Sequence, residues 1–382
     1  MAKNKFQNNS FEGEEKERVA LIKLMTDKNE GAALASLEEL WRLVETAGGE
    51  VAARIIQQKD HPDPATYIGS GKVKELAELC ETADITLAVF DCELSPSQIK
   101  NLEDILGEVR VIDRSMLILD IFALHATSGE GKLQVELAQL KYTVPRLIGK
   151  GTQLSRQGGS ASIAARGPGE TKLETDRRYI KSRINSLERQ IAEMARNRRT
   201  QRAQRDRSGI KRITIAGYTN AGKSTLLNYL TDAGILAENK LFATLDPTTR
   251  RFRLPSGKSV LLTDTVGFIR NLPHHFIKAF QSTLDEVRYA DIVIVMMDAS
   301  DSECMAQAEV TRELLSQLGA GEKPVLYVFN KSDIAEKQED FTRPVLEGAE
   351  VRDVFFISAK TGRGIDKLLS RIDELVPETT YR

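Results

Sequence analysis

The sequence is poor in cysteine and has no long hydrophobic run. Its three cysteines, Cys80, Cys92 and Cys304, share no short spacing, and an odd number cannot form a closed set of disulfides. The longest apolar run, Ile292–Met297, has the length of a strand, whereas a membrane span needs roughly 18 apolar residues. We therefore expect a cytoplasmic protein without a transmembrane segment.

The sequence also lacks an excess of charge of either sign. Its formal net charge is −1, so the chain as a whole creates no field that attracts nucleic acid or membranes. Its four histidines have no metal-ligand spacing. Residues 1–17 are polar, without the apolar segment of a signal peptide, and we expect a disordered leader there. A length of 382 residues predicts two or three domains.

Residues 18–145 alternate short apolar runs with segments of helical spacing. This alternation predicts βαβ units around a parallel sheet, and hence an N-terminal α/β domain. Gly69-Ser70-Gly71-Lys72 lacks the upstream glycine of a phosphate loop, so a turn that caps the next helix is favoured over a second nucleotide site, which stays open. The expected strands are Val19–Leu24, Val51–Ile56, Ile85–Phe90 and Val109–Ile112; the expected helices are Ala33–Glu45, Lys72–Cys80, Pro96–Leu106 and Ser115 to about Lys141.

Residues 146–208 form a different kind of segment, a glycine-rich loop followed by a basic helical linker. Six glycines and Pro168 interrupt both periodicities over residues 146–170, so we expect a long loop there. Apolar residues from Ile180 to Met194 then recur at helical spacing, which predicts a short antiparallel hairpin or coiled coil. Between Arg177 and Arg212 there are 13 Lys or Arg and three acidic residues. A solvated helix face is one interpretation; contact with a phosphate backbone is favoured, because Arg196–Arg207 has almost no compensating acid.

Residues 209–382 contain the pattern G-x-x-x-x-G-K-[ST] of a phosphate loop, from Gly217 to Ser224. The glycines let backbone N–H groups turn around the phosphates, Lys223 neutralises β- and γ-phosphate charge, and the Ser224 hydroxyl ligates Mg²⁺. An apolar strand, Ile213–Ala216, precedes the pattern, and a helix from Thr225 follows it. This order places the phosphates at a helix N-terminus.

A second motif, Asn330-Lys331-Ser332-Asp333, indicates guanine rather than adenine. The Asp333 carboxylate can accept from both ring N1–H and the exocyclic amine of guanine, and adenine would leave it unpaired. We expect Lys331 to lie along the base plane and Asn330 to brace the phosphate loop. Ser358-Ala359-Lys360 would complete the base site through the Ala359 backbone N–H.

Two further segments complete the predicted nucleotide site. Asp264-Thr265-Val266-Gly267 closes a strand, and we expect Asp264 near the magnesium and the Gly267 N–H at the γ-phosphate. The first switch should lie within Phe242–Arg250, where the Phe-x-Thr context and the spacing from Ser224 favour Thr244 over Thr248 as the second magnesium ligand. The predicted GTP site comprises Gly217, Tyr218, Thr219, Asn220, Ala221, Gly222, Lys223, Ser224, Thr225, Phe242, Ala243, Thr244, Leu245, Asp246, Asp264, Thr265, Val266, Gly267, Asn330, Lys331, Ser332, Asp333, Ser358, Ala359 and Lys360.

No catalytic residue is assigned. Ras-like GTPases place a water-orienting glutamine after the glycine equivalent to Gly267, whereas this sequence has Phe268. An apolar side chain cannot orient water by hydrogen bonding, so we expect slow GTP hydrolysis by the protein alone, with the missing group supplied by a partner or another residue.

These motifs resemble those of HflX-type GTPases, a translation-factor-related family near Obg and Era. The resemblance covers nearly the whole chain. It includes Gly217–Ser224, Phe242–Arg250 and Asp264–Arg270, and in the first half Tyr67–Lys72, Asp91–Gln98, Val111–Arg114, Gln134–Leu140 and Arg166–Glu170. The loop before Arg166 is longer and poorer in glycine than the family's pattern.

The resemblance implies a protein that binds GTP or GDP with Mg²⁺ and contacts rRNA of the large ribosomal subunit. In the GTP state such proteins split stalled or idle ribosomes, and stimulation of hydrolysis by ribosomes is expected. Two alternatives are a nucleotide-gated regulator of a protein partner, such as a membrane protease complex, and a ribosome-assembly GTPase. We expect a monomer. Candidate RNA contacts are Arg166, Gly167, Pro168, Gly169, Glu170, Arg196, Arg198, Arg199 and Arg202.

Overall fold

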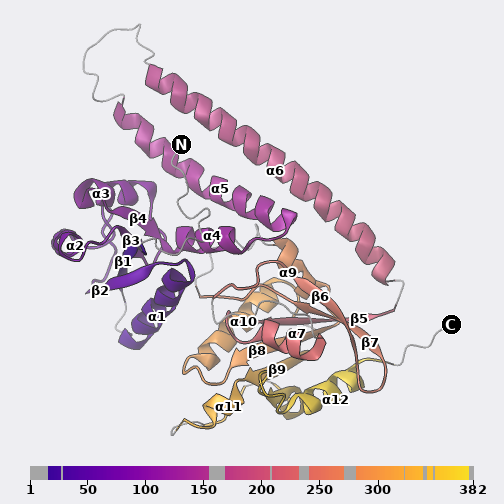
Figure 1. Ribbon diagram of the computed structural model, residues 1–382. Coiled ribbons are helices and arrows are strands. Elements are labelled where there is room, and N and C mark those ends of the chain that lie inside the picture. The colour runs from indigo at the N-terminus through magenta and orange to yellow at the C-terminus, as the bar shows by residue number, and fades with distance from the viewer. Residues whose placement is uncertain are drawn as a thin grey trace. The chain divides into compact units, whose positions relative to one another are not determined.

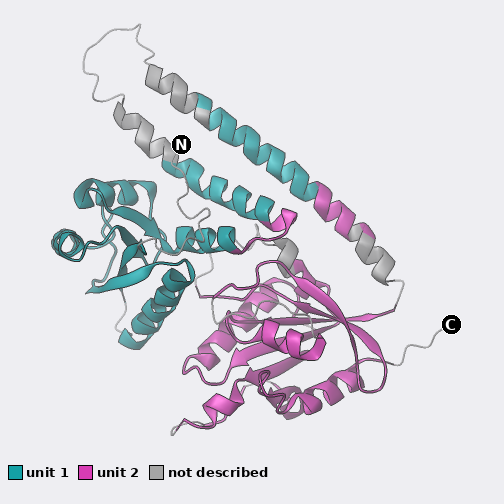
Figure 2. Ribbon diagram, in the orientation of Figure 1, with its two compact units in different colours: residues 1–124, 132–192 teal, residues 125–131, 193–382 magenta. Residues whose placement is uncertain are grey.

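The computed structural model describes residues 16–26, 29–154, 168–206, 209–231, 241–270, 281–321, 323–338, 342–346 and 349–377. The leader predicted over residues 1–17 lies almost entirely outside this range. None of the described helices is long and apolar enough to cross a membrane. The described chain divides into two compact units (Figure 2), one of residues 1–124 and 132–192, the other of residues 125–131 and 193–382. The segment 146–208 therefore contributes to both units.

The first unit contains a four-stranded sheet with the order β2-β1-β3-β4, parallel throughout (Figure 1). The parallel sheet predicted for the N-terminal domain is thus confirmed. Side chains such as Phe90, Leu76 and Leu102 are fully buried between the sheet and its helices. The elements are β1 (Arg18–Met25), α1 (Glu30–Thr46), β2 (Glu50–Gln58), α2 (Ser70–Thr82), β3 (Leu87–Phe90), α3 (Pro96–Leu106), β4 (Arg110–Asp113) and α4 (Arg114–His125).

Helix boundaries in this unit follow local capping chemistry. The Ser95 hydroxyl accepts from the Gln98 backbone N–H, the Gln98 side chain accepts from the Ser95 N–H, and Pro96 occupies the first turn of α3. Such a capping box satisfies two N–H groups that a helix start leaves free. The Gly69-Ser70-Gly71-Lys72 segment is the start of α2, with Gly69 at the N-cap position.

The single helical stretch predicted over residues 115–141 was wrong, because this segment forms parts of two separate helices. Helix α4 ends at His125, and α5 (Gly129–Leu154) begins after a short break in which the Ser128 hydroxyl accepts from the Gly131 N–H. A serine at this position caps the new helix. The predicted loop over residues 146–170 was also too long: α5 continues to Leu154 and α6 (Pro168–Asp206) begins at Pro168. Proline is compatible with a first helical turn, which explains why Pro168 starts a helix instead of ending one.

Helices α5 and α6 run antiparallel and side by side (Figure 1). Within the first unit, Glu136 pairs with Arg183 at 2.7 Å and Lys141 with Glu188 at 2.7 Å. Leu187, from the predicted apolar stripe of α6, is fully buried. The predicted antiparallel hairpin is therefore present, with ion pairs along its seam.

The second unit carries a six-stranded sheet with the order β10-β9-β8-β5-β7-β6. All neighbouring strands are parallel except the edge pair β6 and β7. The elements are β5 (Lys211–Gly217), α7 (Lys223–Thr231), β6 (Thr248–Arg253), β7 (Ser259–Asp264), α9 (Gln281–Arg288), β8 (Ile292–Asp298), α10 (Cys304–Gln317), β9 (Val325–Asn330), α11 (Ser332–Ala335), the 3₁₀ turn η1 (Val351–Asp353), β10 (Val354–Phe356) and α12 (Ile365–Leu375).

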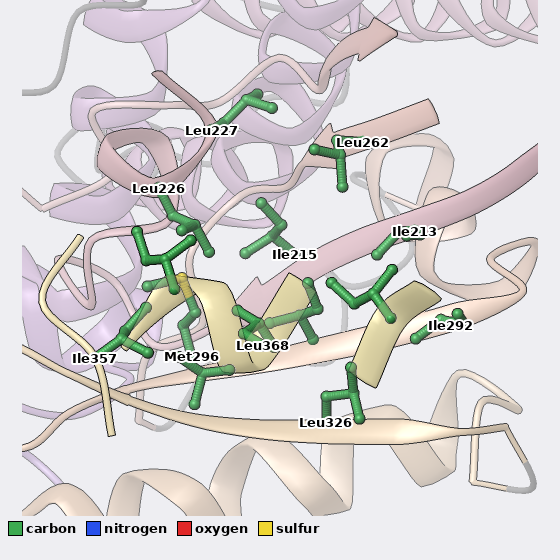
Figure 3. Packing of buried hydrophobic residues seen from close by; sticks show 14 of the residues in the cluster. Ile213, Ile215, Leu226, Leu227, Leu262, Ile292, Met296, Leu326, Ile357 and Leu368 are labelled. Atoms are coloured by element: carbon green, nitrogen blue, oxygen red, sulfur yellow. The ribbon is translucent and has the colours of Figure 1, made fainter. Parts of the chain in front are cut away.

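The core of this sheet explains why its strands are almost wholly apolar. Figure 3 shows Ile215 of β5 near Leu226 of α7 and Leu368 of α12, with Ile213 farther along the same strand, and each of these is at most 1% exposed. Central parallel strands are covered on both faces and so have continuous apolar runs. This buried support fixes the carboxyl ends of β5, β7, β9 and β10, where the predicted site motifs begin.

Candidate functional site

The loop between β5 and α7 needs glycine at two positions. Gly217 has φ +144° and Gly222 has φ +93°, conformations that residues with a side chain rarely adopt. A Cβ on Gly217 would also collide with the Met296 carbonyl, and one on Gly222 with the Asn330 side-chain amide. The loop thus lies against β8 and β9 and leads directly into the N-terminus of α7, where free N–H groups favour anions.

Lys223 is buried at the first position of α7. Its side-chain ammonium donates to the Tyr218 carbonyl at 2.9 Å, and the residue is 6% exposed. Burial lowers the pKa of Lys223 to about 8, although the Asp264 carboxylate opposes that change. A buried ammonium is costly without a counter-charge, so phosphate oxygens bound in this loop would be strongly stabilised by it.

Three oxygen-bearing side chains meet next to this lysine. The Ser224 hydroxyl donates to Asp264 Oδ2 at 2.6 Å and lies 2.8 Å from the Thr244 hydroxyl. Asp264 is fully buried, and burial raises the pKa of its carboxyl group despite the attraction of Lys223. Its second oxygen, Oδ1, has no hydrogen-bond partner among the described residues. The structure therefore brings together the predicted Ser224, Thr244 and Asp264. Thr248 instead starts β6, where its backbone lies opposite Asp264.

Thr219 connects the loop to both neighbouring segments. Its hydroxyl accepts from the Phe242 backbone N–H at 2.8 Å, and a Cβ on Gly267 would lie only 2.6 Å from its Cα. Glycine at 267 permits this close approach. Together these segments line one pocket, formed by Thr219, Asn220, Gly222, Lys223, Ser224, Thr225, Phe242, Ala243, Thr244, Thr265 and Gly267.

Phe268 is part of the core. Its N–H donates to the Gly217 carbonyl at 3.0 Å, and its own carbonyl accepts from the Thr219 N–H at 2.8 Å. The side chain is 1% exposed. Phe268 therefore fixes the segment after Gly267 to the phosphate loop and offers no polar group to a water molecule. The next turn is held by the Arg270 N–H, which donates to the Tyr218 hydroxyl at 2.8 Å.

On the other side of the loop, Asn330 links two segments that are distant in sequence. Its side-chain amide donates to the Ala221 carbonyl at 2.8 Å, and its side-chain oxygen accepts from the Ala359 N–H at 2.8 Å. Asn330 is 3% exposed. The expected bracing contact with the phosphate loop is present. The Ala359 N–H, expected to face guanine, is directed at Asn330 in this structure.

Lys331 and Asp333 follow Asn330 at the carboxyl end of β9. Lys331 adopts a left-handed backbone, and its ammonium lies 2.6 Å from Asp298 Oδ2. Asp333 is half-buried in the short helix α11. The expected position of Lys331 along a base plane stays a prediction. Sequence reasoning missed Asp298, although its place at the end of the buried strand β8 indicated the same sheet edge.

Asp246, included in the predicted GTP site, has its carboxylate engaged elsewhere. It accepts hydrogen bonds from Thr127 and Ser128, the two residues before α5. Burial works to raise the pKa of Asp246, but the hydrogen bonds from Ser128 and Thr127 outweigh it and hold that pKa below its ordinary value. No local pattern indicated Thr127 or Ser128, which lie far from the site in sequence.

The predicted RNA contacts have different surroundings. Arg196 is exposed on α6, whereas Arg198 pairs with Glu130 at 2.8 Å. Residues 168–170, Arg199 and Arg202 have helical backbone, but their side chains lie outside the described set; Arg166 and Gly167 lie outside the described residues altogether. Among the described residues, no group of three or more His, Cys, Asp or Glu could hold a metal ion.

Comparison with known proteins identifies the family to which these motifs belong. Residues 34–123 match the family model for a GTP-binding GTPase N-terminal domain, residues 125–205 the GTP-binding GTPase middle region, and residues 212–331 the 50S ribosome-binding GTPase. The GTPase HflX of Lacrimispora saccharolytica is 49% identical over 360 residues, which cover 94% of this chain and 83% of that protein. The chain belongs to the HflX family of GTPases.

The second HflX relative agrees. The HflX GTPase of Escherichia coli K12 is 42% identical over 342 residues, covering 89% of this chain and 79% of that one. A solved GTP-binding protein from the archaeon Sulfolobus solfataricus, in complex with GDP, is 26% identical, with a TM-score of 0.47 and coverage of 94% and 98%. The predicted HflX resemblance and the P-loop GTPase domain are confirmed: the protein binds guanine nucleotides and hydrolyses GTP.

Proposed function

We propose that this HflX-family GTPase binds the large ribosomal subunit through rRNA and, in its GTP state, promotes the splitting of stalled or idle ribosomes. The observation that carries the proposal is the α5/α6 hairpin, whose helix α6 presents exposed cations including Lys181, Arg189 and Arg196. The family model that matches the G domain is described as 50S ribosome-binding, which supports the same partner.

The hairpin suits contact with folded RNA for a physical reason. Its seam is closed by the ion pairs of Glu136 with Arg183 and of Lys141 with Glu188, so its rigidity does not depend on the exposed cations. Those cations can then pair with phosphates, and RNA of this kind is recognised by shape and backbone more than by base sequence. Arg198 is assigned to the internal ion pair with Glu130 and not to the RNA surface.

We further propose that Ser224 and Thr244 ligate Mg²⁺ together with GTP, with Asp264 beside them. The fit rests on the buried Asp264 Oδ1 without a described partner and on two hydroxyl oxygens 2.8 Å apart, since Mg²⁺ prefers oxygen ligands of this kind. When bound, the ion would neutralise charge on the β- and γ-phosphates. Lys223 would add positive charge at the phosphates, and Asp333 would read the guanine edge.

The protein alone should hydrolyse GTP slowly, because Phe268 is buried in the core and cannot orient the attacking water. A ribosome-induced gain of ~100-fold would need only about 2.7 kcal/mol of added transition-state stabilisation.

Co-sedimentation with purified ribosomes tests the proposal. With a GTP analogue, the protein should sediment with large subunits and lower the ratio of intact ribosomes to subunits; with GDP it should do neither. Binding to isolated large subunits without splitting would favour the assembly GTPase. If the protein binds ribosomes neither with the GTP analogue nor with GDP, the remaining alternative is a nucleotide-gated regulator of a protein partner.

A surface variant tests the route of binding. Replacing Lys181, Arg189 and Arg196 with alanine should weaken ribosome affinity and flatten its salt dependence, because fewer counterions are released. Replacing Arg251 and Arg253 of the exposed edge strand β6 together with the exposed Lys337, all of them outside the first switch, makes a control of equal charge change. Equal loss in both variants would mean that only net charge matters, and the hairpin would lose its assigned role.

A further inference from the structure

The first switch of the G domain is held by residues that lie outside the G-domain sequence. Asp246 Oδ2 accepts from the Thr127 N–H at 3.0 Å, the Thr127 hydroxyl at 2.8 Å and the Ser128 N–H at 2.6 Å, while Oδ1 accepts from the Ser128 hydroxyl at 2.5 Å. We call these three residues the Asp246 clasp. The clasp lies wholly within the second compact unit, which includes residues 125–131 (Figure 2).

Two neighbouring features make the clasp specific to a carboxylate at this place. Ser128 caps α5 by accepting from the Gly131 N–H at 2.8 Å, so its hydroxyl is fixed in direction as it donates to Asp246. Gly131 is pressed against the same carboxylate, and any Cβ there would collide with Asp246 Oδ1. Hydrogen bonds to an ionised group are shorter and stronger than neutral ones, and four donor groups of Thr127 and Ser128 converge on this one carboxylate.

The clasp lies close in sequence to Thr244, one of the two residues proposed to ligate Mg²⁺. Asp246 stands two residues after Thr244, with the buried Leu245 between them. Upstream, Phe242 is fixed to Thr219 by its N–H. The segment from Phe242 to Asp246 is therefore fastened at both ends, and the Thr244 hydroxyl beside Ser224 lies between the two attachments.

We propose that Thr127 and Ser128 are positioning residues for GTP binding and hydrolysis: through Asp246 they hold Thr244 in the place from which it completes the site. This inference rests on the proposed role of Thr244 toward Mg²⁺ and the γ-phosphate. Two residues of the middle region would then help to position the nucleotide site, and a G domain without that region would lack their hydrogen bonds to Asp246. The competing interpretation is that the clasp only stabilises the fold.

Full-length variants Thr127→Val, Ser128→Ala and Asp246→Asn separate these interpretations. Each should weaken the affinity for a GTP analogue, and raise the Mg²⁺ concentration that gives half-maximal GTPase activity, by about tenfold, the size expected for one lost charge-assisted hydrogen bond. Affinity for GDP should change less than twofold, because Thr244 is needed only when γ-phosphate is present. Thr127→Ser, which keeps the hydroxyl, should behave as the parent.

Ser256→Ala provides a matched control. Ser256 also donates both its N–H (3.0 Å) and its hydroxyl (2.5 Å) to one carboxylate, that of Asp373, and neither residue lines the pocket. If the clasp variants lower GTP and GDP affinity together, or match Ser256→Ala in every readout, the positioning role is overturned.

A double-mutant cycle separates this inference from the proposed function. In a Thr244→Val background, Thr127→Val should cause no further loss of GTP-analogue affinity, because both changes remove the same contribution. If Thr244→Val alone leaves the preference between the GTP analogue and GDP unchanged, the proposed role of Thr244 fails. If Thr244→Val alters that preference and the clasp variants do not, only the clasp inference is overturned.

Discussion

Replacing Asn330 with alanine should weaken binding of every nucleotide that the site accepts. Asn330 is 3% exposed and makes two buried hydrogen bonds, one to the Ala221 carbonyl of the phosphate loop and one from the Ala359 N–H. Alanine leaves both backbone groups without a partner, and it also removes the amide that Gly222 contacts. The phosphate loop and the segment around Ala359 would then no longer be held in register.

The size of the effect follows from the two broken bonds. A buried polar group left unsatisfied costs about 1–3 kcal/mol. The free variant can escape this cost by letting the two segments separate and admit water, whereas nucleotide binding needs both segments in place and restores the cost for two groups, at least about 2 kcal/mol. Since about 1.4 kcal/mol corresponds to a tenfold change in Kd, we expect Kd for GDP and for a GTP analogue to rise by about 30-fold or more.

Titration calorimetry with GDP, a GTP analogue and xanthosine diphosphate is the assay. Asn101→Ala in the first unit is the control, because Asn101 makes a single exposed hydrogen bond, at 3.0 Å, to the Ala65 carbonyl. A parallel loss for all ligands is expected if Asn330 acts by bracing loops. A change in base preference, with GDP affinity within threefold of the parent, would refute this reasoning and place Asn330 in direct contact with the base.

Three other changes test separate parts of the structure. Asp333→Asn should weaken GTP and relax specificity toward xanthine nucleotides; unchanged GTP affinity by calorimetry would remove Asp333 from the site. Lys223→Ala should abolish nucleotide binding without lowering the melting temperature of the nucleotide-free protein, because the buried ammonium contributes phosphate contacts and not core packing; a drop in that temperature would contradict this. Asp120, which is 5% exposed, has its pKa raised from 3.8 to about 6 chiefly by burial. Its folded pKa lies above the unfolded value, so its stabilising contribution is present below about pH 4 and is lost as the pH rises through 6. A rise of that size is worth roughly 3 kcal/mol. The free energy of unfolding of Asp120→Asn, measured with denaturant, should therefore rise relative to that of the parent as the pH goes from 4.5 to 7.5. If the difference between the two proteins does not change with pH, burial does not raise the pKa of Asp120.

Much of the fold was predictable because it follows from local pattern. The apolar runs that became β1, β3, β5 and β8 are buried parallel strands, and such strands have near-continuous hydrophobic sequences. The start of α3 at Pro96 was predicted to the residue, because a serine cap and a proline in the first turn are local features. The edge strand β6 was not predicted, since Thr248–Arg253 has little apolar character and forms a strand only by pairing with β7.

The glycine-rich segment was predicted less well than the rest. Gly149 and Gly151 suggested a loop, because glycine weakens a helix by about 1 kcal/mol relative to alanine. Helix α5 nevertheless includes them and ends at Leu154. Local propensity is a weak term beside the pairing of a long helix with a neighbour, and that pairing is not visible in a short window of sequence.

The sequence by itself determined the chemistry of the nucleotide site. Gly217, Gly222 and Lys223 are restricted by backbone conformation and by phosphate charge, and Asp333 by the hydrogen-bonding edge of guanine, so these residue types at this spacing have few other uses. What only the tertiary structure decided is which distant groups complete that site. The pairing of Asp246 with Thr127 and Ser128 joins residues more than a hundred positions apart, and single polar residues of these types occur throughout any soluble chain. Their partners are set by the packing of whole elements, which local periodicity does not record.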